Sequence, residues 1–273
     1  MFDQVKRKSM FQSALGMAEL TYHSIVRNIR KGHNNAIWAL VSNMMQAAIF
    51  ILAFYMMFML IGIKRANIRG DFLLYIISGI FLFMVHIKTI GAITGSDGPS
   101  SAMMQHAPMN TIISIAAAAI GTLYIQVLTL FVILFVYHVA ITPFEIEDPA
   151  GAFAMLLIAW LAGVAIGLVL LSMKPWFPGL VAIFTTVFQR VNMIASGKMF
   201  VANTLPAFML PMFEWNPLFH LIDQARGFMF VNYVPRNTSI EYPVIVAASL
   251  LVIGMMAEFY TRQHASSSWN ARR

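Results

Sequence analysis

Hydrophobic positions along the chain gather into six long runs separated by shorter polar segments. The runs cover residues 36–63, 72–90, 111–141, 150–173, 176–194 and 243–260. A helix that crosses the hydrocarbon core of a bilayer needs about 20 predominantly apolar residues. The pattern therefore predicts an all-α integral membrane protein with six transmembrane helices. These helices fill residues 36–260, between an N-terminal cytoplasmic arm at residues 1–35 and a cytoplasmic tail at residues 261–273.

The arm before the first run is amphipathic at helical spacing. Its apolar stripe consists of Phe11, Ala14, Leu15, Ala18, Tyr22, Ile25, Val26 and Ile29. A helix with one apolar face and a basic polar face, next to a membrane span, is typical of a helix in the headgroup plane. We predict such an N-terminal interfacial helix. The alternative is a helix that packs on a partner.

Composition narrows the class of protein further. Hydrophobic residues make up 59% of the 273 residues and charged residues 11%, against about 25% charge in an ordinary soluble domain. The mean hydropathy is +0.74. This composition excludes a soluble enzyme and a disordered chain. The chain has no cysteine, which excludes a disulfide framework and a thiolate metal site.

The net charge of +7 indicates orientation rather than nucleic-acid binding, because no basic stripe accompanies a soluble module. Lys and Arg collect on the cytoplasmic side of membrane proteins. With both termini in the cytoplasm, 11 of the 18 basic residues lie on that side. The basic loop 64–69 runs against this orientation, and the acidic loop 145–148 suits the outer side. We predict cytoplasmic N- and C-termini.

The loop between the second and third runs contains a turn cluster at residues 95–99 and then a short helical stretch at residues 100–107. Ser100 is a suitable N-cap for that stretch. A helix this short is not stable alone, so the membrane surface or a partner protein must hold it. The alternative is a simple connector between spans.

Aromatic residues follow the tight loop after the fourth run. They are Trp176, Phe177, Phe184 and Phe188. Trp176 suits an anchor at the membrane interface. The aromatic residues of this stretch face lipid or pack in the protein, or all four, Trp176 included, line a substrate path, because aromatic faces offer a sugar ring a flat apolar contact.

Prolines break the apolar segment 195–242. Asn216 and Pro217 together form a helix start, with Asn as the cap and Pro at the first helical position. We predict a pair of short helices before the last span that forms a re-entrant hairpin or an interfacial lid on the outer side. In the second of these helices, Asp223 and Arg226 are three residues apart, which favours an ion pair between them.

Motifs of several enzyme classes are absent. No phosphate-binding loop occurs, since the only Gly-Lys pair, Gly197-Lys198, is followed by Met199. The seven His residues do not pair at metal-ligand spacing. Carboxylates are nearly absent from the spans, and Glu258 lies near the end of the last one, where we expect it to reach water. Ion-coupled carriers place ionisable groups near the bilayer middle, so any transport here draws its energy from elsewhere.

The run Asn216-Pro217-Leu218-Phe219-His220, followed by Arg226 and preceded by Ser196-Gly197 and Leu205-Pro206, resembles the region before the last span of ABC-2 type permeases. The order of arm, six spans, loop helix and proline-broken outer segment is similar to one branch of that family. This branch exports capsular polysaccharide, O-antigen or teichoic acid.

The resemblance implies a permease of the bacterial inner membrane that works as a homodimer with two ABC ATPase subunits. A lipid-linked glycan would pass between the permease copies. The chain would be no enzyme and hold no cofactor, with ATP and magnesium on the partner. A coupling helix seated on the ATPase would include Ser100, Ser101, Met103, Met104, Gln105 and His106. The outer gate would include Asn216, Pro217, His220, Asp223 and Arg226.

Three alternatives stay open. One is an ABC-2 permease for a drug or a lipid, which shares the layout. The second is an ATP-independent channel or carrier, which the lack of carboxylates at the bilayer middle disfavours. The third is an intramembrane enzyme such as a lipid-sugar transferase, for which Asp223 and Arg226 are the candidate residues.

Overall fold

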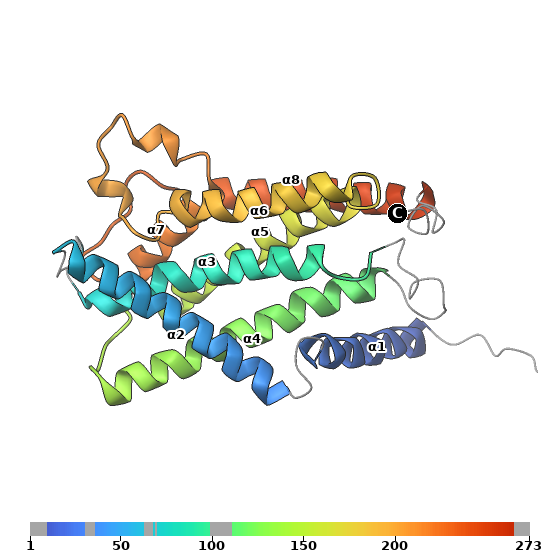
Figure 1. The fold of residues 1–273 in the computed structure, drawn as a ribbon, viewed down its shortest axis with the longest axis horizontal. Helices are drawn as coiled ribbons and strands as arrows, with labels where there is room; N and C mark the ends of the chain where they lie inside the picture. Colours follow the sequence, from blue (N-terminus) through green and yellow to red (C-terminus); the bar gives the residue numbers. More distant parts are fainter. Residues whose placement is uncertain (1–9, 31–35, 63–67, 69, 99–110, 265–273) are drawn as a thin grey trace, which may run out of the picture.

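The computed structural model describes residues 10–30, 36–62, 68, 70–98 and 111–264 of the chain. Its helices are α1 (Met10–Arg30), α2 (Ala36–Leu60), α3 (Phe72–Thr94), α4 (Thr111–Ala140), α5 (Pro149–Met173), α6 (Pro178–Ala195), α7 (Pro217–Met229) and α8 (Glu241–His264), with two 3₁₀ turns at Ala202–Thr204 and Leu210–Met212. The described part of the chain contains no strand. The helices run side by side in an elongated bundle (Figure 1).

The six predicted spans are confirmed. Helices α2, α3, α4, α5, α6 and α8 are long and apolar enough to cross a membrane, and their bounds lie within four residues of the predicted ones. The amphipathic helix in the arm is also confirmed as α1, which packs against α4. Its position in the headgroup plane stays a prediction. The predicted coupling helix at residues 100–107 lies outside the described residues.

Polar residues at loop ends explain where two of the spans begin. Asp71 precedes α3, and its side chain accepts hydrogen bonds from the backbone N–H groups of Leu73 and Leu74. Asp148 caps α5 in the same way, with Pro149 in the first turn. These caps satisfy N–H groups that have no partner inside the helix, which matters most where water is scarce.

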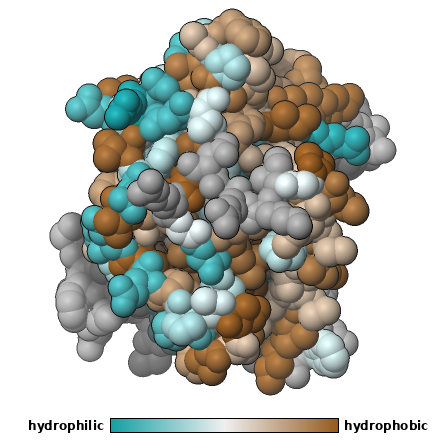
Figure 2. All heavy atoms as spheres, turned by 90° about the vertical axis from the view of Figure 1, so that its left-hand side faces the viewer, coloured by the Kyte–Doolittle hydropathy of each residue, from teal (hydrophilic) through white to brown (hydrophobic). Residues whose placement is uncertain are grey.

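The two ends of the bundle are distinct. At one end, Asp148 donates its backbone N–H to the carbonyl oxygen of Phe228, just before the C-terminus of α7, at 2.8 Å. At the other end, Lys174 donates to the carbonyl oxygen of Thr94 at 2.9 Å, and Arg27 of α1 forms an ion pair with Asp97 at 3.6 Å. We name these the α7 end and the α1 end. Figure 2 looks onto the α7 end, where hydrophilic residues are spread between hydrophobic ones.

Helix α3 is the centre of the bundle and is buried along most of its length. It packs against α5 through small residues. A Cβ atom at Gly163 would lie 2.8 Å from the carbonyl oxygen of His86, and one at Gly167 would lie 2.9 Å from Ile93. Glycine lets membrane helices approach closely, so van der Waals packing and backbone contacts hold α3 and α5 together.

The expectation that Glu258 reaches water is wrong. Its side chain is 6% exposed. Glu258 lies one turn after Gly254, where a Cβ atom would lie 3.0 Å from the Leu168 side chain of α5. The carboxylate is therefore on the face of α8 that packs against α5, rather than on a face that meets the headgroups.

Gly163→Ala should destabilise the protein, because the new methyl group would meet the backbone of α3 rather than a flexible side chain. We expect a loss of ~1–3 kcal/mol in the free energy of unfolding, the usual magnitude for overpacking. A lower melting midpoint in detergent would report this loss. Gly179→Ala is the matched control, since nothing lies within 4 Å of a Cβ atom there. Equal midpoints for the two variants would contradict close α3–α5 packing.

Candidate functional site

The predicted start of the helix before the last span is confirmed. Asn216 caps α7, since its Oδ1 accepts a hydrogen bond from the backbone N–H of Leu218 at 3.0 Å, and Pro217 occupies the first turn. The amide nitrogen of Asn216 also donates to Oδ1 of Asn192 at 3.0 Å and to the carbonyl oxygen of Ala195 at 2.9 Å. One side chain thus begins α7 and ties it to the end of α6.

Helix α7 lies inside the bundle rather than on its surface. It packs against α3, α5 and α8, and its apolar side chains Leu218, Leu221, Ile222 and Ala225 are buried. Two 3₁₀ turns stand where the first helix of the predicted pair was expected. Pro206 forces an extended conformation on Leu205 and, like Pro211, lacks an N–H donor, so a regular α-helix does not form there.

Arg226 organises the loop that leads into this region. Its side chain is completely buried and donates to the carbonyl oxygens of Gly197 at 3.0 Å, Lys198 at 2.7 Å and Phe200 at 2.6 Å. The guanidinium carbon lies 4.1 Å from the centre of the Tyr75 ring of α3. The arginine thus supplies hydrogen bonds to three backbone acceptors of the irregular loop, of which only the Gly197 carbonyl oxygen also accepts from a backbone N–H group, that of Phe200 at 3.3 Å.

Asp223 accepts hydrogen bonds from two further loop segments and so connects them to α7. Its Oδ1 accepts from the Tyr233 hydroxyl at 2.5 Å and from the backbone N–H of Ala202 at 3.2 Å, and its Oδ2 accepts from the Thr238 hydroxyl at 2.9 Å. Burial, and next the charge of Asp223, raise the pKa of Tyr233. The predicted ion pair between Asp223 and Arg226 is wrong, because each side chain turns to a different loop.

His220 has a fixed tautomer. Its Nδ1 accepts a hydrogen bond from the backbone N–H of Ser239 at 3.1 Å, so its proton is on Nε2, which donates to the carbonyl oxygen of Glu214 at 2.8 Å. Both ring nitrogens are therefore used in the structure. Over the described ranges, no group of three His, Asp or Glu side chains could hold a metal ion.

Lys198 is a buried residue near this network that the sequence pattern did not indicate. Its side chain is 3% exposed, and its Nζ lies 3.5 Å from the ring centre of Phe83 and 5.0 Å from those of Phe50 and Phe54. Among the described residues, Nζ of Lys198 has no hydrogen-bond partner. Burial lowers the pKa of Lys198 to about 7, while the faces of the three rings attract the ammonium and offset part of this effect.

Two glycines make room for this arrangement. Gly197 has a positive φ of 72°, and a Cβ atom there would lie 2.5 Å from the Phe219 ring. A Cβ atom at Gly79 of α3 would lie 2.8 Å from Nη2 of Arg226 and 2.9 Å from Cα of Lys198. The only sequence feature that marks this position is the Gly197-Lys198 pair just after the end of α6. Nothing in the sequence pattern indicates that three phenylalanines from α2 and α3 surround Lys198.

The aromatic residues predicted as a possible substrate path do not face one cavity. Trp176 donates to the Thr261 hydroxyl at 3.1 Å and stacks on Tyr260 of α8. Phe177 and Phe184 are exposed on the flank of the bundle. Phe188 stacks on Phe184 and lies beside His86 of α3. Their role in a path stays a prediction.

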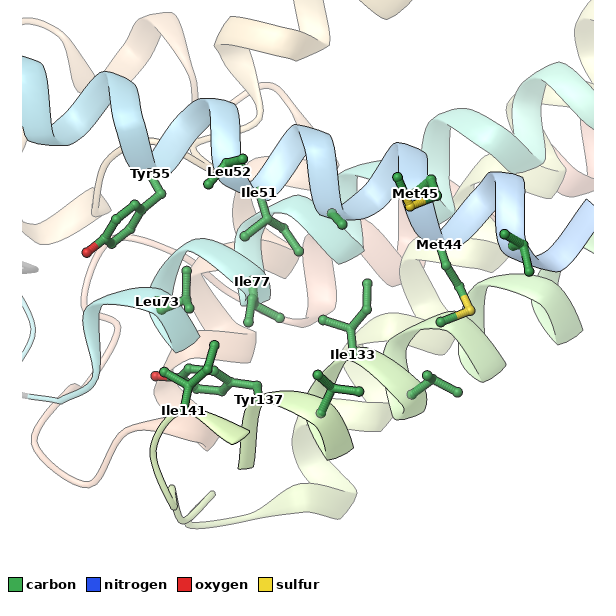
Figure 3. Close-up of a pocket in the computed structure, with 14 residues that line it drawn as sticks. Met44, Met45, Ile51, Leu52, Tyr55, Leu73, Ile77, Ile133, Tyr137 and Ile141 are labelled. Carbon is green, nitrogen blue, oxygen red and sulfur yellow. The ribbon is translucent and has the colours of Figure 1, made fainter. Parts of the chain in front are cut away.

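A groove of about 610 Å³ runs along the other flank, between α2 and α4 with α3 behind. Side chains of α2 and α4 point toward one another across it, with Tyr55 and Tyr137 at one end and Met44 at the other (Figure 3). Its lining is almost entirely apolar, as suits a surface that meets lipid chains. The predicted coupling residues, Ser100, Ser101, Met103, Met104, Gln105 and His106, lie outside the part that the structure describes.

Together, the fold and the site define a multi-pass α-helical membrane protein whose α7 end is closed by a buried polar network. No protein-family model matches the chain. Two polysialic acid transport proteins from Escherichia coli, both named KpsM, are each 23% identical to it over 203 residues, which is 71% of this chain and 75% of the relative. The resemblance to polysaccharide-export permeases is confirmed by this homology.

Arg226→Met should destabilise the α7 end strongly, because the carbonyl oxygens of Lys198 and Phe200 would lose their donor and that of Gly197 would keep only the Phe200 N–H. An unsatisfied buried acceptor costs about 1–3 kcal/mol. We expect a clearly lower melting midpoint in detergent. Arg236→Met is the matched control, since Arg236 is exposed at the same end. Equal loss in both variants would show that the carbonyl contacts of Arg226 do not stabilise the fold.

Lys198→Met should remove a pH dependence of stability. The pKa is about 7 in the folded protein and about 10.4 in an unfolded chain. Between these values the unfolded chain holds the proton and the folded one does not, so stability rises with pH. We expect the melting midpoint of the unmodified protein to rise from about pH 7 to about pH 10, and that of the variant to rise less. Parallel profiles would contradict a titrating, buried Lys198.

Proposed function

We propose that the chain is the membrane-spanning permease subunit of an ATP-driven exporter that moves a lipid-linked polysaccharide across the bacterial inner membrane. The similarity to KpsM over most of the chain carries this proposal. The six helices that can cross a membrane support it. The absence of a phosphate-binding loop from the sequence also fits a subunit that leaves ATP hydrolysis to another protein.

The partners follow from the same proposal. Two copies of an ABC ATPase hold ATP and magnesium, and this chain holds no cofactor. Both termini lie in the cytoplasm, so the α1 end is the cytoplasmic one. The loop between α3 and α4 is at that end, next to the Arg27–Asp97 ion pair. The described chain before the proposed coupling helix therefore ends beside a contact between α1 and the end of α3.

The permease works as a homodimer with the glycan passing between its copies. Helix α6 is the least buried of the six spans and presents an apolar face that includes Leu180, Ile183, Phe184 and Val187. Lipid or a second copy covers such a face. The gate residues Asn216, His220, Asp223 and Arg226 hold the α7 end in shape and perform no chemistry.

Deletion of the gene in its own host tests the function. We expect surface polysaccharide to disappear and lipid-linked glycan to accumulate inside the cell, with both effects reversed by the intact gene. Normal surface glycan together with increased drug sensitivity or altered lipid export would favour the alternative ABC-2 substrates instead. Transport that continues without any ATPase partner would favour a channel or carrier.

Met104→Glu tests the coupling helix. A coupling helix must make contacts that differ between two states of its partner, and flexible methionines suit a groove that changes shape. We expect the variant to insert in the membrane, while co-purification of the ATPase and glycan export fall together. Gln263→Glu, an added charge at the exposed end of α8, is the control. Full partner binding and export with Met104→Glu would make this loop a simple connector.

A further inference from the structure

A polar pocket of about 350 Å³ lies between α2, α3 and α4 in the half of the bundle near the α1 end. Lys88 of α3 lines it and donates to Oδ1 of Asn43 at 3.1 Å and to Oε1 of Gln46, both on α2. Gln126 of α4 donates to the same oxygen of Asn43 at 3.1 Å. Asn43 in turn donates to the Thr129 hydroxyl at 2.9 Å.

Two polar residues of the pocket, Lys88 and Asn43, lie within the third of their helices that is nearest the α1 end. Lys88 is six residues before the end of α3 at Thr94, which is about 9 Å along a helix that rises 1.5 Å per residue. Asn43 is a similar distance from the start of α2 at Ala36. A lysine at this depth can reach a charged group at the membrane surface.

Lys88 lacks an acidic partner among the described residues, because their ion pairs involve Glu19 and Asp97 only. Its two hydrogen-bond acceptors are neutral amides. An ammonium has three donors, so one is left for a group in the pocket. A half-buried cation beside a polar cavity, held by neutral side chains, is complementary to an anion.

Gln126 adds a second requirement for an occupant of the pocket, which is a hydrogen-bond donor. Its side chain is 1% exposed, and its Oε1 has no hydrogen-bond partner within the part of the chain that the structure describes. A buried acceptor of this kind costs free energy unless a donor fills it. An occupant with both a negative charge and a hydroxyl group would satisfy Lys88 and Gln126 together.

We propose that this pocket binds the headgroup of an anionic membrane phospholipid from the leaflet at the α1 end. A phosphate oxygen accepts from Nζ of Lys88, and a headgroup hydroxyl donates to Oε1 of Gln126. The lipid chains lie in the bilayer against the exposed apolar side of α2. The site would tie α2, which contacts its neighbours along only part of its surface, to α3 and α4 through a bound lipid.

The test uses the full chain in nanodiscs that contain phosphatidylglycerol or only phosphatidylcholine. Native mass spectrometry after mild detergent transfer counts the lipids that stay bound. We expect one phosphatidylglycerol molecule to be retained selectively by the unmodified chain. Lys88→Gln should lower that retention at least tenfold, and Lys88→Arg, which keeps the charge, should restore most of it. Lys174→Gln removes an exposed charge at the same end and should change nothing.

A photoreactive residue at position 42, which lines the pocket, identifies the occupant directly. We expect an adduct with the lipid that disappears in the Lys88→Gln background. A cross-link to a second copy of the chain would overturn the proposal, since a neighbouring protein would then fill the pocket. Equal retention of phosphatidylglycerol by the Lys88→Gln and unmodified proteins would overturn the proposal as well. So would a loss of bound phosphatidylglycerol in Lys174→Gln as large as that in Lys88→Gln. The melting midpoint of each variant confirms that it is folded.

Discussion

The α7 end depends on the hydrogen bonds from Arg226 to the carbonyl oxygens of Gly197, Lys198 and Phe200. Irregular backbone at membrane depth is stable only where the protein itself satisfies its polar groups. Arg226 satisfies three acceptors from one fully buried position, and its guanidinium plane rests on Tyr75. Because Asp223 and Asn216 do the same for the loops on either side, a helix of 13 residues holds the whole connection between α6 and α8.

The spans could be predicted because a long apolar run leaves few alternatives in a bilayer, and the start of α7 could be predicted because Asn216 and Pro217 act locally. The hydrogen-bond partners of Arg226 and Asp223 could not be predicted from the sequence. Spacing of three residues along a helix permits an ion pair, but it does not reveal that two loops distant in sequence offer nearer acceptors and donors. The environment of Lys198 could not be predicted either, since it depends on how α2 and α3 pack around a loop that follows α6.

Three basic side chains that lie wholly or partly inside the bundle share one feature. Arg226, Lys88 and Lys198 are held by carbonyl oxygens, amide oxygens and aromatic rings respectively, and within the described ranges none of them forms an ion pair. A proton relay through the membrane needs groups that exchange protons with each other. Neutral acceptors and ring faces cannot take a proton from these side chains, so the arrangement suits packing and ligand binding better than ion coupling.

The packing also limits which parts can move together. Helices α3, α5 and α7 are joined by close glycine contacts and by the Arg226 network, and α8 packs closely along α5. Helices α2 and α6 are mostly exposed, and α6 meets the rest of the bundle at few points besides the Asn192–Asn216 hydrogen bond. Packed interfaces shift as units rather than deforming continuously. A conformational change that preserves the buried network therefore moves α3, α5, α7 and α8 as one body, together with the end of α6 that Asn216 ties to α7.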